Sequence, residues 1–287
     1  MTETLLEVRD VVVDYPVKGF RKAPFRALGG VSLDVAPGEC VGLVGESGSG
    51  KTTLGRAVLG LAPVTSGSIT YRGREISRLR NRERRALAAD LQVVFQDPYT
   101  SLNPSLTIEQ ILTEPLIARR TDKQQARRRV RELLDAVHLP SDAGNRLPRE
   151  FSGGQRQRVA IARALALDPK LIVCDEPVSA LDLSTQARVL DLFKEIQART
   201  GVAYLFVSHD LDVVRYLSQR VAVMYRGEIV EWGDANQVTV HPQHPYTQRL
   251  FLAAPVADPV KQEQRRAERH RLLALQQEQD EQMEINA

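Results

Sequence analysis

Two glycine-containing segments of the chain have residue types that bind phosphate groups. The first is GESGSGKT, in which three glycines precede a lysine and a threonine. Glycines let the backbone turn tightly so that its N–H groups converge on phosphate oxygens, and a following helix N-terminus adds partial positive charge. Lys51 would neutralise the outer phosphates, and the Thr52 hydroxyl would bind Mg²⁺. We therefore predict a nucleotide-binding loop made by Gly45, Glu46, Ser47, Gly48, Ser49, Gly50, Lys51, Thr52 and Thr53.

Acidic residues follow a second apolar run, KLIVCDEP, which predicts a buried strand ending at Asp175 and Glu176. In open α/β sheets, ligands bind at the carboxyl ends of strands. Asp175 would hold the hydrated metal, and Glu176 would orient and deprotonate the attacking water. FVSHD repeats this pattern and places His209 where it would contact a γ-phosphate. Alone, a carboxylate pair only marks a strand end and a single histidine is usually structural, but the glycine-rich loop favours a catalytic role.

The second glycine-containing segment is FSGGQRQRVAIARAL. Ser152 is a plausible N-cap, and Gly153 and Gly154 expose backbone amides at the start of a helix, so this turn should also bind an anion. One ATP does not need two such cradles when a glycine-rich loop already wraps its phosphates. We therefore expect the second cradle to serve a nucleotide held by another chain, so that two chains arranged head to tail sandwich two ATP molecules.

Strands that alternate with helices predict an α/β fold with a mostly parallel sheet. LLEVRDVVVDY, VSLDV and CVGLVG are expected as strands near the N-terminus, with a basic loop over residues 16–28 and a hairpin in GSITYRGREI. Residues 97–168 have helical spacing and no strand candidates, which indicates a helical subdomain. We expect one domain over residues 1–255, and a charged tail over 256–287 that is either helical or disordered.

Composition limits the function classes. The chain has 287 residues, 26% charged and 43% hydrophobic, and its net charge of +3 is too weak to argue for nucleic-acid binding. Cys40 and Cys174 each lie in an apolar run, so we interpret them as small buried hydrophobes. The first residues, MTETLLEVRD, do not have the pattern of a secretion signal, and no apolar stretch is long enough to span a membrane. If the protein works at a membrane, other chains must cross it.

In this order, GESGSGKT, FSGGQ, LIVCDEP, SALD and SHD resemble the nucleotide-binding subunit of an ATP-binding-cassette (ABC) transporter, over roughly residues 5 to 255. The resemblance implies a P-loop NTPase core, an N-terminal antiparallel β subdomain and a helical signature subdomain. It implies that FSGGQ is the signature that completes the partner's site, through Ser152, Gly153, Gly154 and Gln155. It further assigns Gln96 to the Q-loop that touches Mg²⁺, Asp182 to the D-loop, His209 to the switch histidine, and Tyr15 to the aromatic that stacks on adenine.

A narrower resemblance is carried by QDPYTSLNP, CDEPVSALDLSTQA and HPQHPYTQRL, which look like ATPases of the oligopeptide, dipeptide and nickel importers. It implies a second ATPase subunit (a paralogue or an identical copy), two transmembrane permease subunits and an extracytoplasmic substrate-binding protein. It places the chain at the cytoplasmic face of the inner membrane. Several relatives hold an iron–sulfur centre with C-terminal cysteines, but no cysteine follows Cys174 here, so we expect ATP and Mg²⁺ and no cluster.

Other functions stay open at this point. We expect the ATP-hydrolysing subunit of an importer for dipeptides or oligopeptides. One alternative is the same machinery serving nickel or another small solute, and a second is a soluble ABC ATPase that acts on nucleic acid or ribosomes. The latter often carry tandem cassettes, long coiled-coil insertions or zinc cysteines, which this sequence lacks, so we expect no nucleic-acid partner. A catalytically silent cassette is disfavoured because Lys51, Gln155, Glu176 and His209 are all present.

Overall fold

The long apolar runs of the sequence form a six-stranded sheet in the computed structural model, which describes residues 4–17, 19 and 23–253. Counted across the sheet, five neighbouring strands pair in parallel, and the strand at one edge, formed by residues 228–234, pairs with its neighbour in the antiparallel sense. The middle strands are buried on both faces, which explains why they contain almost no polar residues. From one edge to the other, the strands are β6 (Leu91–Val94), β7 (Leu171–Asp175), β8 (Ala203–Val207), β3 (Cys40–Val44), β9 (Arg220–Tyr225) and β10 (Glu228–Asp234).

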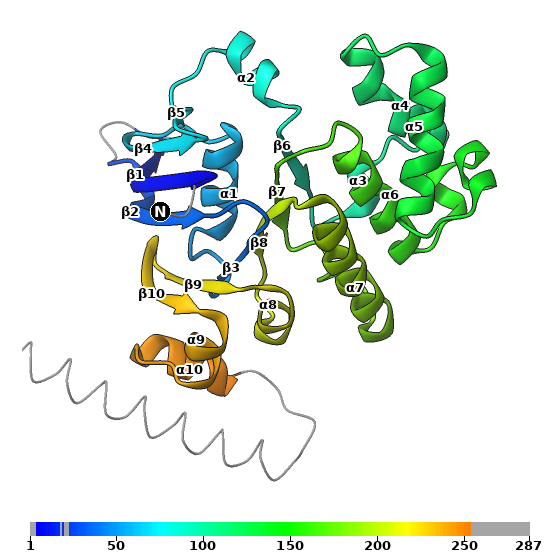
Figure 1. Cartoon of the computed structure of the whole chain (residues 1–287). Helices are drawn as coiled ribbons and strands as arrows, with labels where there is room; N and C mark the ends of the chain where they lie inside the picture. The colour runs from blue at the N-terminus through cyan, green and yellow to red at the C-terminus, as the bar shows by residue number, and fades with distance from the viewer. Residues whose placement is uncertain (1–3, 18, 20–22, 254–287) are drawn as a thin grey trace, which may run out of the picture.

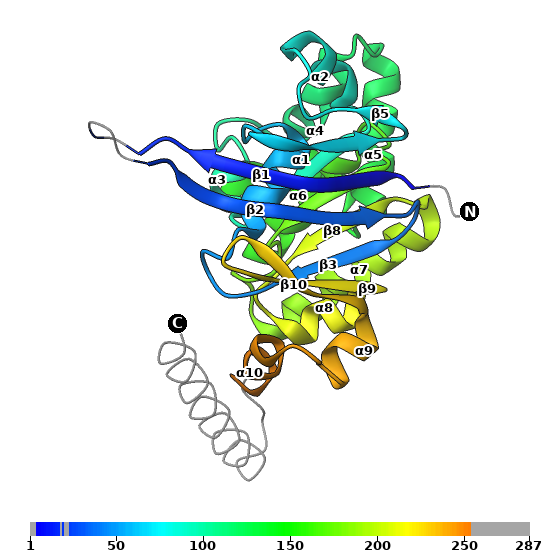
Figure 2. The ribbon, with the colours of Figure 1, turned by 90° about the vertical axis from the view of Figure 1, so that its left-hand side faces the viewer.

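A second, antiparallel sheet is built mainly from the N-terminal part of the chain. Its order is β2-β1-β4-β5, and Figure 2 shows β1 and β2 as a long pair running side by side. The strands are β1 (Leu6–Tyr15), β2 (Phe25–Val35), β4 (Ser66–Tyr71) and β5 (Arg74–Glu75). The expected hairpin in GSITYRGREI is confirmed by the β4–β5 pairing. The expected loop over residues 16–28 was wrong at its end, because pairing with β1 extends β2 back to Phe25, opposite Tyr15.

The two faces of the large sheet carry different packing partners. Alternate side chains of β3, β7 and β8 contribute to one core cluster with the antiparallel sheet and α1 (Lys51–Leu59), which therefore lies between the two sheets. Side chains on the opposite face, which include both buried cysteines, belong to a second cluster with α6 (Gly153–Leu165) and α7 (Leu183–Thr200). This confirms the interpretation of Cys40 and Cys174 as small hydrophobes. Burial in this core raises the pKa of the Cys40 thiol to about 12.

Residues 98–165 contain helices and no strand, as their spacing predicted. Three of these helices begin at polar caps: Thr107, Asp122 and Ser152 accept hydrogen bonds from the first backbone N–H groups of α4, α5 and α6. Figure 1 shows this helical group on the side of β6 and β7 that faces away from α1. The elements are α3 (Pro98–Ser101), α4 (Ile108–Ala118), α5 (Lys123–Ala136), η1 (Ser141–Asn145), η2 (Pro148–Glu150) and α6 (Gly153–Leu165).

The remaining helices connect or flank the strands of the large sheet. α7 supplies Phe193, whose ring packs edge-to-face on Tyr204 and Phe206 of β8 at 5.4 Å and 5.5 Å between centroids. α2 was not foreseen in the sequence because its arginine-rich segment has little apolar periodicity. The remaining helices are α2 (Asn81–Leu87), α7 (Leu183–Thr200), α8 (Leu211–Leu217), α9 (Ala235–Val240) and α10 (Pro245–Ala253). The expected tail over 256–287 lies outside the described residues, and the proposed domain limits stay a prediction.

Candidate active site

The glycine-rich loop joins the end of β3 to the start of α1, in the middle of the large sheet. Gly45 has a φ of 150°, and a Cβ atom there would lie 2.2 Å from the main-chain oxygen of Met224. No larger residue fits, because the neighbouring strand β9 forms a wall directly behind the loop. Within the loop, the Lys51 ammonium donates hydrogen bonds to the oxygens of Gly45 and Glu46 at 2.7 Å and 2.8 Å.

The Lys51 side chain is largely enclosed, and the residue is 5% exposed. Burial lowers its pKa, while the nearby carboxylates of Glu176 and Asp175 act in the opposite direction. A buried ammonium held by two carbonyl oxygens concentrates positive charge inside the loop. The loop therefore has the electrostatics of an anion cradle before any ligand binds.

A hydroxyl and a carboxylate meet at the edge of the loop. The Thr52 hydroxyl donates to Asp175 Oδ1 at 3.0 Å, and Asp175 is the last residue of β7. Burial raises the Asp175 pKa, and the hydrogen bond from Thr52 opposes that rise. Two hard oxygen donors close together, beside the glycine-rich loop, fit a hydrated Mg²⁺.

Parallel pairing of β7 with β8 brings the second carboxylate and the histidine together. Asp175 is in register with Val207, so Glu176 and His209 follow at the same edge of the sheet. Their side chains meet with 2.9 Å between Glu176 Oε2 and His209 Nδ1. Glu176 has a φ of 49°, unusual for a residue with a side chain, and its N–H donates to the Val207 oxygen. Tertiary structure thus holds this carboxylate in a strained backbone position, as is common at active sites.

Gln96 and Tyr15 lie on elements that lead toward this edge. β6 pairs with β7 so that Val94 is opposite Cys174, and Gln96 follows two residues later in an exposed position. Tyr15 ends β1 and is partly buried against the core cluster shared with α1. The contacts assigned to these two side chains are with a metal and a nucleotide base, so their roles stay predictions.

The FSGGQ turn opens α6, on the opposite side of β7 from α1 in Figure 1. Ser152 and Gln155 form a capping box in which the Ser152 N–H donates to Gln155 Oε1 at 2.9 Å, and the Gln155 N–H donates to Ser152 Oγ at 3.4 Å. Ser152 and Gln155 are exposed, whereas Gly154 is buried. The structure therefore groups Lys51, Thr52, Asp175, Glu176 and His209 at one edge. It leaves Ser152 and Gln155 of the second cradle exposed at the start of α6.

The start of α7 lies directly against this turn. A Cβ atom on Gly154 would lie 2.2 Å from the γ-methyl carbon of Thr185. Asp182 caps α7 by accepting from the Thr185 N–H at 3.0 Å and the Ser184 hydroxyl at 2.7 Å. Both hydrogen bonds lower the pKa of Asp182, and the one from Thr185 has the larger effect. The sequence did not single out Thr185, because its importance depends on a glycine 31 positions earlier that only the fold places beside it.

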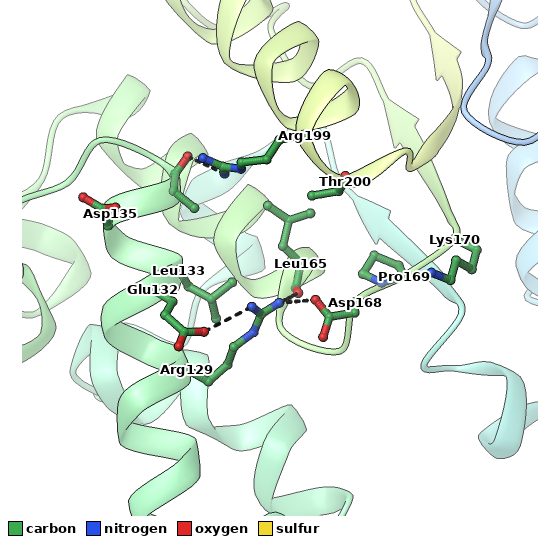
Figure 3. A pocket seen from close by; sticks show the side chains of 11 residues that line it. Arg129, Glu132, Leu133, Asp135, Leu165, Asp168, Pro169, Lys170, Arg199 and Thr200 are labelled. Atoms are coloured by element: carbon green, nitrogen blue, oxygen red, sulfur yellow. Dashed lines mark hydrogen bonds and ion pairs between the residues drawn. The ribbon is translucent and has the colours of Figure 1, made fainter.

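A cavity of about 480 Å³ lies elsewhere, between α5 and the segment that leads into β7 (Figure 3). Arg129 donates to the Leu165 oxygen at 2.9 Å and pairs with Asp168 and Glu132. Lys170 lines this cavity and immediately precedes β7, so the cavity is at the end where the strand begins. The cavity therefore lies at the opposite end of β7 from Asp175 and is distinct from the candidate active site.

Comparison with known proteins gives consistent matches. A family model described as ABC transporter matches residues 28–179. The chain is 46% identical over 270 residues to the oligopeptide transport ATP-binding protein OppF of Lactococcus lactis subsp. lactis, covering 92% of the chain and 85% of that protein. It is 48% identical over 266 residues to the glutathione import ATP-binding protein GsiA of Pectobacterium atrosepticum, covering 91% of the chain but only 43% of GsiA.

A solved structure agrees with these matches. The ATP-binding cassette MJ0796, in a dimeric post-hydrolysis state bound to ADP and Pi, is 30% identical, with a TM-score of 0.72. The match covers 80% of the present chain and 98% of that one. Among the described residues, none of the helices combines the length and the hydropathy of a membrane span.

The packing of Gly154 gives a first prediction. Gly154→Ala places a methyl group against Thr185, and overpacking of this kind costs about 1–3 kcal/mol of stability. Thr185→Ser removes only the methyl carbon at 2.2 Å, and the next nearest atoms of Thr185 lie at 3.6 Å and 3.9 Å. We expect the Gly154→Ala/Thr185→Ser double variant to unfold at a higher temperature than Gly154→Ala in a thermal melt. Equal melting temperatures for these two variants would show that the contact with Thr185 does not limit the size of the side chain at position 154.

Proposed function

Because the chain belongs to the ABC transporter family, we propose that it is the ATP-hydrolysing subunit of an importer whose solute is a peptide. The observation that carries the catalytic part is the convergence of Lys51, the Thr52–Asp175 pair and the Glu176–His209 pair at one sheet edge. The peptide assignment is supported by the relatives' names, since OppF is an oligopeptide transport protein and GsiA imports glutathione, itself a small peptide.

ATP phosphates would occupy the loop formed by residues 45–53, where backbone N–H groups, the α1 N-terminus and the buried Lys51 ammonium supply positive charge. Thr52 and Asp175, with Gln96 as a further candidate, would hold Mg²⁺, which when bound neutralises charge on the phosphate oxygens. Tyr15 is the candidate for stacking on adenine. Phe25, its partner across the β1–β2 ladder, is 60% exposed and offers a second aromatic at the same place.

Glu176 is the proposed general base. Its carboxylate would orient a water molecule and accept its proton while the oxygen attacks the γ-phosphorus and the bond to ADP breaks. His209 Nδ1 lies 2.9 Å from Glu176 Oε2, and this side chain would hold the carboxylate and contact the γ-phosphate. The support for this role is the contact with His209 at the ends of β7 and β8, since a positive φ alone is shared by carboxylate residues elsewhere, Asp10 at 46° and Asp168 at 53°.

The FSGGQ turn would complete the site of a second ATPase subunit, with Ser152, Gly153, Gly154 and Gln155 facing the partner's γ-phosphate and Asp182 at the junction. ATP held from both sides favours a closed pair, and loss of the γ-phosphate removes the bridge, so hydrolysis reopens it. The motion would pass to two transmembrane permease subunits through the Gln96 region and the helical part. We place the complex at the cytoplasmic face of the inner membrane, with an extracytoplasmic protein that delivers the solute.

Glu176→Gln tests the general base. We expect hydrolysis to fall by about 10²–10⁴-fold because the amide cannot accept the proton, while ATP still binds and holds a closed dimer. The measurements are phosphate release and size-exclusion chromatography with ATP. Glu195→Gln is the matched control, since Glu195 contacts His138 at 2.8 Å in another His–Glu pair away from the sheet edge, and it should hydrolyse ATP normally. If the Glu176→Gln variant released phosphate at the wild-type rate, Glu176 would not be the general base.

Ser152→Arg tests the shared site. A large cation at the turn should block the facing nucleotide and abolish the partner-dependent ATPase rate, while ATP binding to the monomer is unchanged. The control is Thr107→Arg, which breaks the equivalent capping box at the start of α4 and costs about 1 kcal/mol of cap stability. It should leave ATP-dependent dimerisation intact. A loss of monomer ATP binding in Ser152→Arg would contradict the cross-chain assignment.

A further inference from the structure

The segment HPQHPYTQRL, which the catalytic assignment does not use, folds into a short connection and the start of α10. The Glu231 carboxylate of β10 accepts hydrogen bonds from the backbone N–H groups of Gln243 at 2.8 Å and His244 at 3.1 Å. His244 Nδ1 in turn accepts from the Tyr246 N–H at 3.2 Å. The histidine therefore serves the backbone at this helix start. These hydrogen bonds fix where Tyr246 lies.

Tyr246 is directed into the protein. It is 3% exposed, and its ring packs on Tyr225 of β9 with 4.3 Å between centroids. It belongs to a small core cluster with residues of β3 and β9, on which α9 and α10 lie (Figures 1 and 2). Its hydroxyl accepts a hydrogen bond from the backbone N–H of Glu46 at 3.0 Å, across 200 positions of sequence.

The Glu46 N–H belongs to the same peptide unit as the Gly45 oxygen, which accepts from the Lys51 ammonium at 2.7 Å. This one peptide is thus held by Tyr246 on one side and by Lys51 on the other. Met224, the neighbour of Tyr225, closes the space behind it through the contact with Gly45. The Gly45–Glu46 peptide is therefore held by hydrogen bonds to Lys51 and to Tyr246 of α10, with β9 directly behind it.

We propose that Tyr246 is a positioning residue for nucleotide binding, and that α10 acts as a brace for the phosphate-binding loop. A loop already held in its binding conformation loses less conformational entropy when a ligand binds, so affinity rises without any new contact to the ligand. Tyr246 does not need to touch the nucleotide for this effect. The inference rests on the proposed role of residues 45–53 as the phosphate cradle.

Tyr246→Phe removes the hydroxyl and keeps the ring on Tyr225. Loss of one hydrogen bond that orders the loop should weaken ADP binding by about two- to tenfold. We expect KM for ATP to rise similarly, with kcat little changed at saturating ATP. Amide hydrogen exchange over residues 45–53 of the nucleotide-free protein should be faster than in the wild type. Isothermal titration calorimetry with ADP measures binding without turnover.

Tyr204→Phe is the matched control, because it removes a buried hydroxyl that donates to the Phe193 oxygen at 3.2 Å, within the core. It should lower thermal stability without changing ADP affinity or exchange in the loop. If Tyr246→Phe binds ADP and exchanges like the wild type, or behaves only as Tyr204→Phe does, the brace is refuted. Lys51→Ala separates the two proposals: unchanged ADP binding in that variant would refute the phosphate cradle, whereas exchange in Tyr246→Phe still reports the brace.

Discussion

Parallel pairing of β3, β8 and β7 is the constraint on which the candidate active site depends. It places the carboxyl ends of three buried strands at one edge, so Thr52 and Asp175 meet there although they are 123 positions apart in the sequence. The loop after β3 supplies positive charge, the end of β7 supplies two carboxylates, and the end of β8 supplies a histidine. A shift of one residue in the β7–β8 register would separate Glu176 from His209 and turn alternate core side chains to the wrong face.

A second consequence of the fold is that the cradle at FSGGQ cannot be treated as an isolated turn. Its buried glycine lies against Thr185, and Thr185 lies in the first turn of the helix capped by Asp182. The part of the chain proposed to serve the partner's nucleotide is therefore in direct contact with the segment that follows its own two carboxylates. In the glycine-rich loop between β3 and α1, Gly45 and Glu46 are in turn confined by α10 and β9. The FSGGQ turn is thus in contact with the start of α7, and the glycine-rich loop is in contact with α10.

Much of this arrangement follows from the sequence because its signals are local. Apolar runs that end in Asp-Glu or in Ser-His-Asp predict buried strands with chemistry at their ends, and the spacing in GESGSGKT predicts a strand, a turn and a helix. The start of β2 at Phe25 was missed because strand pairing, not composition, extends it. Thr185 and Tyr246 were missed for a related reason: each depends on a partner distant in sequence. For Tyr246, the HPYT segment carries a family resemblance, but nothing in its sequence indicates a contact with Glu46.

The central claim is that each reaction centre needs two ATPase subunits. It is tested most directly by the ATPase rate per molecule, measured across a wide range of protein concentration with the partner ATPase present at equal concentration. Analytical ultracentrifugation on the same samples gives the fraction of dimer. If each reaction centre is shared by two subunits, the rate per molecule rises with the fraction of dimer and approaches zero where only monomers remain. A rate that stays at its maximum in samples shown to be monomeric would contradict it.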